Sequence, residues 1–367
     1  MSLIFPKKEI LYAPMLGTLG GGSARGFGQG VSSGIKLYES GLWAMGDGQG
    51  TDGYGMVRYD PNNFDRLVTS NTVPVSGSYP STMADTYRNS SGTVYLIGIS
   101  GSNIYAYSSS SLNQITSTNI IYDTRGMMVH GDYAYVAPNN HDDFRRYSLS
   151  SISNISLSAT VYNGAGVQDW EGMVAVGGYL YFGGRDGWIA VVQESNFQRQ
   201  TTTRVNSNTN EITAMCYGAN GYLYAGYNNG DIVRFNSYPN GMSATHQYQS
   251  AIGIVEDLEV DRFGNIHVIM RGQTNAYLVL DQTLTFVAQG NLPMQVPTAI
   301  LINDYVYIGD HTAVGQHYKY YVPDVIAGTF SPTNAGTKYG PTTNTLLSSY
   351  NQSDLHQKNL EQGGLSF

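Results

Sequence analysis

Apolar and polar residues alternate along most of the chain in short runs bounded by glycine, asparagine and aspartate. One such run, Tyr179–Phe182, follows Gly178 and is itself followed by a second run, Trp188–Gln193. Alternation with a period of two is typical of strands that bury one face. No amphipathic run of useful length with helical spacing interrupts this pattern. The chain is therefore predicted to be all-β.

The strand pattern is repeated along the sequence. An alternating run with an aromatic or histidine anchor recurs on average every 44 residues between Trp43 and Tyr307. The anchors are Trp43, Tyr95, Tyr135, Tyr181, Tyr224, His267 and Tyr307. A period of this length, with about four short strands per unit, is typical of a β-propeller blade. The seven units predict a seven-bladed β-propeller, and a ring of six or eight blades stays open if the first copy is miscounted.

The unit around Tyr181 predicts the four strands of one blade. Glu171–Val176 is expected as the inner strand, Tyr179–Phe182 as the second, Trp188–Gln193 as the third and Gln200–Val205 as the outermost. Small residues lie beside several anchors, where neighbouring blades are expected to converge: Gly98, Gly183, Gly226 and Gly309. Tyrosine and other large residues are expected to fill the wider outer zone.

Two segments lie outside the repeat, which occupies residues 34–322. Residues 1–33 contain seven glycines between Gly17 and Gly30. Such a run does not form a packed element by itself, so this segment is predicted to be an extended arm. Residues 323–367 are rich in serine, threonine, asparagine, glutamine and glycine. This second segment is predicted to be a polar tail that is either disordered or ordered against a partner subunit.

Composition narrows the classes of function. Charged residues make up 13% of the chain and the net charge is −8, which argues against binding to nucleic acid or to an anionic membrane. No apolar run is long enough for a transmembrane helix, and the N-terminus lacks the apolar core of a signal peptide. The single cysteine, Cys216, excludes an internal disulfide and a cysteine-based zinc site. No motif indicates a cofactor or a metal site.

Loops on one face of the predicted propeller carry the candidate ligand-binding residues. Loops between second and third strands, together with connections between blades, contribute Asp47, His141, Asp142, Asp143, Trp170, Glu171, Arg185, Asp257 and His311. The run 139–143 offers hard oxygen ligands for Ca²⁺ or Mg²⁺, but a solvated turn is the favoured interpretation. Carboxylates at or near the entrances to the inner strands could act as acid and base on a glycosidic bond, but capping of backbone N–H groups is favoured. They are Asp85, Asp169, Glu171, Glu211, Glu256 and Asp257. Trp170 is expected at the rim, where it could stack on a sugar ring.

Several segments resemble blades of known propeller families. Glu256–Val268 resembles an NHL-type blade, with an apolar strand, an aspartate, a Gly-Asn turn and a second apolar strand. Residues 178–192 and 221–235 resemble quinoprotein-type blades. Each resemblance covers about one blade and implies the propeller fold rather than a particular chemistry.

The segment Leu11–Gly28 resembles the leader of structural proteins of tailed bacteriophages, particularly tail and appendage components. The resemblance implies that an extended arm anchors a β-rich body in the particle. The arm residues expected to make these contacts are Leu11, Tyr12, Leu16, Leu19, Arg25 and Phe27. It also implies other virion proteins as partners in a homo- or hetero-oligomeric assembly, and a location in the virion after assembly in the host cytoplasm.

The sequence therefore favours a structural virion component, such as a tail-fibre, appendage, adaptor or decoration protein. It would dock through its arms and present a propeller face to another protein or to a host-surface glycan, without enzymatic activity. Two alternatives stay open. One is a carbohydrate-active propeller enzyme that uses the axial carboxylates, and the other is a cellular NHL-like interaction scaffold. The arm could also be a flexible leader without a role.

Overall fold

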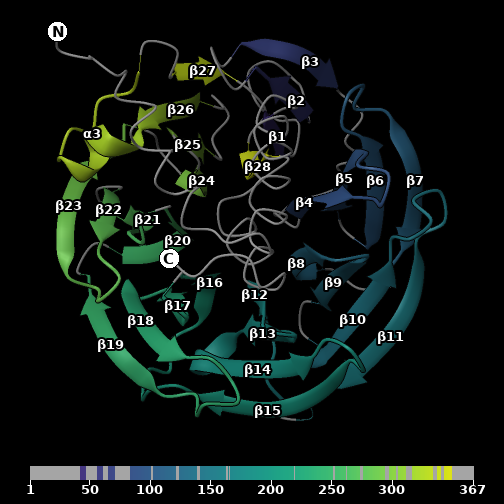
Figure 1. The fold of residues 1–367 in the computed structure, drawn as a ribbon, viewed down its shortest axis with the longest axis horizontal. Coiled ribbons are helices and arrows are strands. Elements are labelled where there is room, and N and C mark those ends of the chain that lie inside the picture. Colours follow the sequence, from purple (N-terminus) through teal and green to yellow (C-terminus); the bar gives the residue numbers. More distant parts are fainter. Residues whose placement is uncertain are drawn as a thin grey trace, which may run out of the picture.

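Short antiparallel strands make up nearly all of the described structure, as the alternating pattern predicts. The computed structural model describes residues 42–46, 56–60, 65–70, 83–100, 102–120, 124–138, 141–162, 164, 166–218, 220–250, 253–261, 263–272, 276–293, 297–302, 305–310, 316–333, 337–339 and 343–348. These residues form seven four-stranded sheets, which we number 1 to 7 along the chain (Figure 1).

Each sheet has four strands, ordered from the innermost to the outermost. Sheet 1 comprises β28 (Thr343–Ser348), β1 (Leu42–Gly46), β2 (Met56–Tyr59) and β3 (Arg66–Ser70). Sheet 2 comprises β4 (Met83–Arg88), β5 (Val94–Ser100), β6 (Asn103–Ser108) and β7 (Gln114–Asn119). Sheet 3 comprises β8 (Thr124–His130), β9 (Tyr133–Pro138), β10 (Asp143–Ser148) and β11 (Ser156–Tyr162). Sheet 4 comprises β12 (Gly172–Val176), β13 (Tyr179–Gly183), β14 (Trp188–Gln193) and β15 (Gln198–Arg204).

The remaining sheets follow the same order. Sheet 5 comprises β16 (Ile212–Tyr217), β17 (Tyr222–Tyr227), β18 (Asp231–Asn236) and β19 (Ala244–Gln249). Sheet 6 comprises β20 (Gly253–Val260), β21 (Ile266–Gly272), β22 (Ala276–Leu280) and β23 (Phe286–Asn291). Sheet 7 comprises β24 (Pro297–Ile302), β25 (Tyr305–Asp310), β26 (Gln316–Tyr321) and β27 (Thr337–Tyr339). A 3-10 turn, η1 (Arg185–Gly187), precedes β14, and a short helix, α3 (Val322–Ile326), follows β26.

The sheets are arranged around a central axis as a β-propeller, which confirms the predicted fold. The inner strands contact one another in the order β4, β8, β12, β16, β20, β24 and β28, and β28 contacts β4. Every anchor of the sequence repeat, from Trp43 to Tyr307, lies on the second strand of its sheet. In sheet 4, β12 to β15 match the four predicted strands to within two residues.

The C-terminal boundary of the propeller differs from the prediction. The sequence pattern places residues 323–367 outside the repeat, but they supply β27 to sheet 7 and β28 to sheet 1. β28 pairs antiparallel with β1, with Leu42 opposite Ser348, so strands from the two ends of the chain close the ring. Main-chain hydrogen bonds hold such a strand whatever its composition, which explains why a polar segment serves here. The predicted arm, residues 1–33, lies outside the described residues.

Glycines allow neighbouring sheets to approach closely near the axis, as expected for Gly183 and Gly226. A Cβ atom on Gly183 would lie 2.5 Å from Ile212 Cγ2, and one on Gly226 would lie 2.3 Å from Val255 Cγ1. Tyrosines fill the space between sheets, and Tyr59, Tyr107, Tyr135, Tyr147, Tyr181, Tyr224, Tyr227, Tyr277, Tyr307 and Tyr320 are all nearly fully buried. Core packing therefore accounts for many of the 30 tyrosines in the chain.

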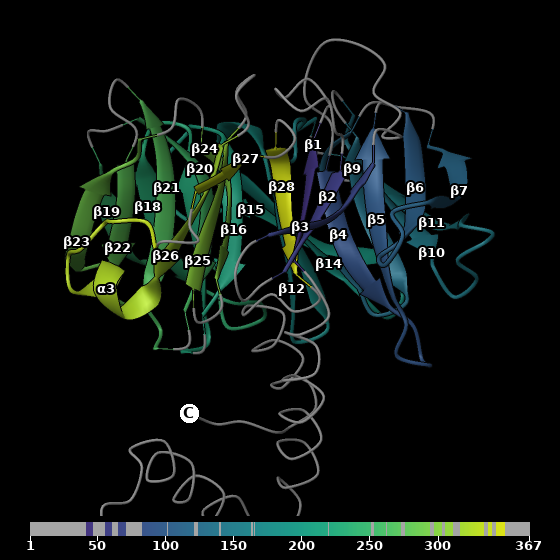
Figure 2. The same cartoon turned by 90° about the horizontal axis from the view of Figure 1, so that it is seen from above.

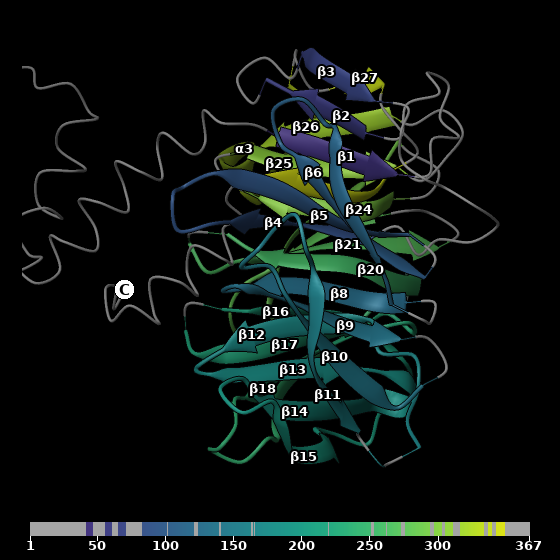
Figure 3. The same ribbon diagram turned by 90° about the vertical axis from the view of Figure 1, so that its right-hand side faces the viewer.

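A bulge interrupts the pairing of the outermost strand in sheets 1 to 6. Register shifts lie between Arg58 and Tyr59 in sheet 1 and at the matching place in the next five sheets. Figure 1 places these outer strands along the rim of the ring, and Figure 3 shows β11 from outside. Bulges twist an edge strand away from the flat geometry that pairs with another chain. They therefore protect the exposed edges from unwanted association.

The strands run between two faces that bear turns and loops (Figure 2). We call the end with the first-to-second and third-to-fourth strand turns, such as 177–178 and 194–197, face A. We call the opposite end, with loops such as 185–187 and 205–211, face B. No helix within the described ranges is long and apolar enough to cross a membrane.

Candidate functional site

Several residues that the sequence singles out lie outside the described part of the chain. They are Leu11, Tyr12, Leu16, Leu19, Arg25 and Phe27 of the predicted arm, and Asp47 and His311 of the predicted ligand face. The other predicted face residues belong to face B or to the adjoining ends of strands.

Trp170 is fully buried rather than exposed at the rim. Its ring packs edge-on against Phe144 with 5.1 Å between centroids, and its Nε1 atom donates a hydrogen bond to the carbonyl oxygen of Val167 over 3.2 Å. A Cβ atom on Gly184 would lie 2.7 Å from Trp170 Cε3. Trp170 therefore belongs to the core between sheets 3 and 4. The expectation that it stacks on a sugar ring is wrong, because an indole packs best where its apolar area is covered.

Asp143 is buried and holds its own loop in place. It forms an ion pair with Arg145 over 2.8 Å, and Arg145 Nη1 donates to the carbonyl oxygen of Ile120 over 2.7 Å. The neighbouring His141 and Asp142 are partly buried. Among the described residues, no three histidine, cysteine or acidic side chains are grouped in a way that could hold a metal ion.

Asp257 links the inner strands of two sheets. Its Oδ1 atom accepts from the backbone nitrogen of Leu258 over 2.9 Å, and its Oδ2 atom accepts from that of Ile300 on β24 over 3.0 Å. Asp85 on β4 makes the same pair of bonds, at 2.6 Å to Thr86 and 2.7 Å to Val129 on β8. These carboxylates cap backbone N–H groups across a sheet junction, which is the interpretation that the sequence favours. Burial raises the pKa of Asp257 to about 7.

Arg185 and Glu171 lie beside the same loop on face B. The half-exposed guanidinium of Arg185 pairs with the buried carboxylate of Asp169, and its backbone nitrogen donates to the oxygen of Gln168 over 3.2 Å. Glu171 is partly buried, and its backbone nitrogen donates to the oxygen of Gly183 over 2.9 Å. The structure therefore brings Trp170, Glu171 and Arg185 to one sheet junction, while Asp257 lies two sheets further round the ring.

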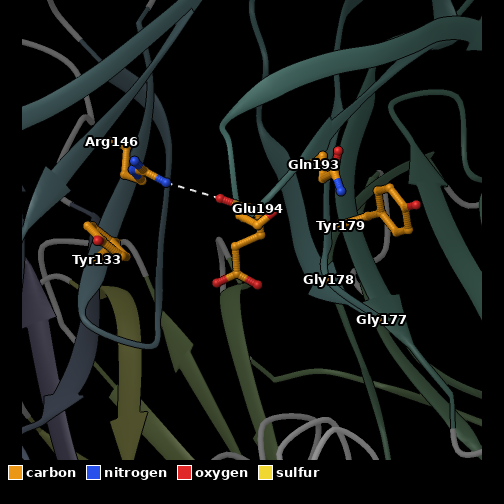
Figure 4. A pocket seen from close by; sticks show the side chains of 8 residues that line it. Tyr133, Arg146, Gly177, Gly178, Tyr179, Gln193 and Glu194 are labelled. Carbon is orange, nitrogen blue, oxygen red and sulfur yellow. Dashed lines mark hydrogen bonds between the residues drawn. The ribbon is translucent and has the colours of Figure 1, made fainter.

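An open pocket of about 420 Å³ lies on face A, between sheets 3 and 4. Its lining comes from the start of β9, from β10, from the turn between β12 and β13, and from the end of β14 (Figure 4). The lining residues are Tyr133, Arg146, Gly177, Gly178, Tyr179, Gln193, Glu194 and Ser195. Face A is opposite to the face on which the sequence placed the candidate ligand residues.

Arg146 joins the two sheets that form this pocket. Its guanidinium carbon lies 4.5 Å from the centroid of the Tyr133 ring and 5.2 Å from that of Phe197. Its Nη1 atom donates to the carbonyl oxygen of Glu194 over 3.0 Å (Figure 4). A planar guanidinium combines such stacking with a directed hydrogen bond, so Arg146 holds sheet 3 against the end of β14.

Glu194 carries the negative charge of the pocket. Its Oε1 atom accepts from the hydroxyl of Tyr135 over 3.2 Å, and its Oε2 atom lies 3.4 Å from Nε2 of His130. Burial raises the pKa of Glu194, but the hydrogen bonds and charges of His130, Tyr135 and Arg146 outweigh it and hold this pKa below the ordinary glutamate value. The carboxylate is therefore ionised at neutral pH and can accept hydrogen bonds from a ligand.

Gly177 and Gly178 have no side chains and therefore leave one side of the pocket open. Both have positive φ angles, 61° and 76°, as the tight turns of two-residue hairpins require. No heavy atom lies within 4 Å of the place that a Cβ atom would take on either glycine. Tyr179, directly after the turn, packs edge-on against Tyr238 with 5.0 Å between ring centroids. This contact turns the Tyr179 ring toward sheet 5, away from Tyr133 and Arg146 (Figure 4), so the two glycines leave this side of the pocket open.

Sequence reasoning missed this pocket for a physical reason. Its residues come from positions 133 to 195 and meet only where two sheets pack side by side. Tyr133 and Arg146 look like ordinary strand positions in the alternating pattern. One signal is present: a cation recurs on the third strand opposite the anchors of four sheets, as Arg58, Arg146, Arg234 and Lys319.

Comparison with known proteins identifies only the fold. No protein-family model matches the chain, and no curated protein matches it. A solved structure described as that of a "putative 6-phosphogluconolactonase" from Bacteroides fragilis is similar, with a TM-score of 0.64 at 12% sequence identity. The match covers 83% of this chain and 97% of that one. At this identity the likeness concerns architecture alone, and the chain is accordingly a β-propeller protein.

Proposed function

We propose that this chain is a non-enzymatic binding protein that presents a carbohydrate-binding pocket on face A of its propeller. The pocket between sheets 3 and 4 carries this proposal. It combines the ring of Tyr133, the ionised carboxylate of Glu194 and the guanidinium of Arg146 around an open volume of about 420 Å³. Ligand sites of this kind are concave and contain a few convergent polar groups.

Carbohydrate chemistry fits this set of groups. Sugar hydroxyls both donate and accept hydrogen bonds, and the pocket offers acceptors on Glu194 and donors on Arg146. The C–H faces of a sugar ring pack against an aromatic ring, which Tyr133 supplies. Tyrosine suits such contacts because it offers a large apolar area with a polar tip.

The carboxylates suggested for catalysis have structural partners. Asp85 and Asp257 each accept one backbone hydrogen bond from the next residue of their own strand and one from the inner strand of the next sheet. Asp169 is paired with Arg185. These contacts support a binding role rather than glycoside hydrolysis. Because the similar structure is described as a lactonase, hydrolysis of 6-phosphogluconolactone is the enzyme assay to run in parallel, and turnover of that lactone would overturn the proposal.

The binding test uses an array of bacterial surface polysaccharides and the full chain. Tyr133→Ala should weaken binding to the recognised polysaccharide by about fivefold, because an aromatic contact contributes about 1 kcal/mol. Glu194→Gln should weaken it as well, since the ionised acceptor is lost. Tyr162→Ala is the matched control, because this tyrosine is 71% exposed on the outer strand β11. Equal binding by all three variants, or no binding by the unmodified chain, would contradict the proposal.

We place this binding role in the particle of a tailed phage, as a tail or appendage component that docks through its N-terminal segment. The support is the resemblance of Leu11–Gly28 to phage structural leaders and the low content of charged residues, 13%. Deletion of residues 1–33 should abolish incorporation into purified particles, measured by immunoblot, while circular dichroism of the deleted protein stays unchanged. Normal incorporation of the shortened chain would overturn the docking role.

A further inference from the structure

We infer that face A bears a second carbohydrate site, at the junction of sheets 5 and 6. This inference rests on the proposed function and extends it from one binding pocket to two. The second site would hold a neutral sugar ring of the same repeating polysaccharide. Its residues occupy the positions of the first pocket's residues, two sheets further round the ring.

The cation of the second site has the same contacts as Arg146. Arg234 lies with its guanidinium carbon 4.2 Å from the centroid of the Tyr222 ring, as Arg146 does over Tyr133. Its Nη1 atom donates to the carbonyl oxygen of Gln282 over 2.7 Å. Val191 in sheet 4 and Val279 in sheet 6 are equivalent, because each lies opposite the anchor of its sheet. Three residues further along the chain, Gln282 is therefore equivalent to Glu194. The two arginines therefore fasten equivalent turns.

Two further features are shared by the sites. Tyr224 donates to the carbonyl oxygen of Gln282 over 2.9 Å, and the equivalent Tyr135 contacts Glu194. Gly264, in the turn before β21, has a φ of 88°, close to the 76° of Gly178 in the turn before β13. A Cβ atom on Gly264 would lie 3.7 Å from Gln282 Oε1, so this glycine and this amide border the same space.

The differences between the sites indicate what the second one binds. Gln282 stands where the first pocket has Glu194, so a neutral amide replaces an ionised carboxylate. Phe263, beside Gly264, is 60% exposed and adds an aromatic ring where the first pocket has Gly177. An exposed ring with a primary amide recognises hydroxyl groups without selecting a charge. These groups favour a neutral sugar.

The alternation of sheet types explains why this junction resembles the first one. Opposite the second-strand anchor, sheets 3 and 5 carry arginine on the third strand, whereas sheets 2, 4 and 6 carry Ser108, Val191 and Val279. The arginine-bearing sheet supplies the stacked guanidinium. The next sheet supplies the turn whose carbonyl oxygen accepts a hydrogen bond from it. Two such sites on one rigid face let a repeating polymer engage both, which raises overall affinity without any new contact.

The test is fluorine NMR of the full chain labelled with 3-fluorotyrosine, with Tyr133→Phe and Tyr222→Phe used to assign two resonances. The probes are the methyl glycosides of glucose, galactose, mannose, rhamnose and N-acetylglucosamine. At least one probe should shift the Tyr222 resonance. Phe263→Ser should weaken that response about fivefold and leave any response at Tyr133 unchanged.

Three results would overturn the inference. If probes shift Tyr133 but none shifts Tyr222, the second site is wrong while the proposed function stands. If neither resonance shifts with any probe, both the second site and the proposed function are wrong. If the Tyr222 response is unchanged in Phe263→Ser, the sugar does not bind at this junction.

Discussion

Asp257 on β20 accepts a hydrogen bond from the backbone nitrogen of Ile300 on β24 over 3.0 Å. The same carboxylate also accepts from the backbone nitrogen of Leu258 on its own strand. One side chain thus fastens the inner strands of sheets 6 and 7 together. Asp85 and Val129 repeat this arrangement between sheets 2 and 3 over 2.7 Å, so side-chain bridges reinforce junctions that main-chain pairing does not span.

The stability of the protein should decrease with rising pH through the titration of Asp257. Burial raises its folded-state pKa to about 7, above the ordinary aspartate value of 3.8. The folded state therefore keeps a proton that the unfolded state releases, and the resulting stability is present below about pH 4 and is lost as pH rises through 7. Urea unfolding at pH 5 and pH 8 should show a smaller loss of stability for Asp257→Asn than for the unmodified chain.

Asp257→Asn should also be less stable at pH 5, because an amide nitrogen cannot accept the second backbone hydrogen bond. Identical pH profiles for Asp257→Asn and the unmodified chain would contradict the assignment.

Gly226→Ala should destabilise the propeller by about 1–3 kcal/mol, a typical cost of overpacking. The added Cβ atom would lie 2.3 Å from Val255 Cγ1 and 2.8 Å from Leu258 Cδ2 in the next sheet. Val255→Ala in the same chain removes the closer contact and should recover part of the loss. A double-mutant cycle of unfolding free energies measures this recovery. Strictly additive effects would argue against close packing at this junction.

Arg234→Met should destabilise the chain by about 2–4 kcal/mol, because charged hydrogen bonds are among the stronger ones. The guanidinium donates to Gln282 over 2.7 Å and to Thr245 Oγ1 over 2.9 Å, besides stacking on Tyr222. Arg234→Lys keeps the charge but lacks the planar fork, so it should recover only part of the loss. Thermal unfolding temperatures should decrease from the unmodified chain to Arg234→Lys and then to Arg234→Met.

Arg146→Met tests separately whether an arginine of this kind stabilises each sheet junction. Arg146 makes its contacts at the junction of sheets 3 and 4, so its effect on unfolding free energy should add to that of Arg234→Met within about 0.5 kcal/mol. Strong coupling between the two substitutions would show that the junctions are not independent.

Removal of residues 341–367 should open the ring. This truncation deletes β28, the inner strand of sheet 1, and leaves β1 paired with β2 on one side only. A shorter truncation, of residues 349–367, keeps β28 and is the matched control. The longer truncation should lower the thermal unfolding temperature and broaden the transition, followed by circular dichroism. Equal unfolding curves for the two truncated chains would contradict a role of β28 in closure.

The alternating pattern and its repeat were sufficient to predict the local structure and the fold class. In sheet 4, strand limits followed from turn residues and period-two patterning, because these depend on neighbours in sequence. The glycines at 183 and 226 were predicted correctly as points of close approach, since a residue without a Cβ atom has an evident use where sheets converge. The same local logic explains the capping by Asp257.

The tertiary structure alone decided the features that depend on residues far apart in the chain. Ring closure joins β28 to β1, and nothing in the polar sequence of β28 indicates that partner. Trp170 is buried because sheet 3 packs over it, although its position in a loop sequence predicted exposure. The pocket on face A exists because Arg146 of one sheet meets Glu194 of the next. Alternation reports which side of a strand is buried, but not which residue of a neighbouring sheet lies against it.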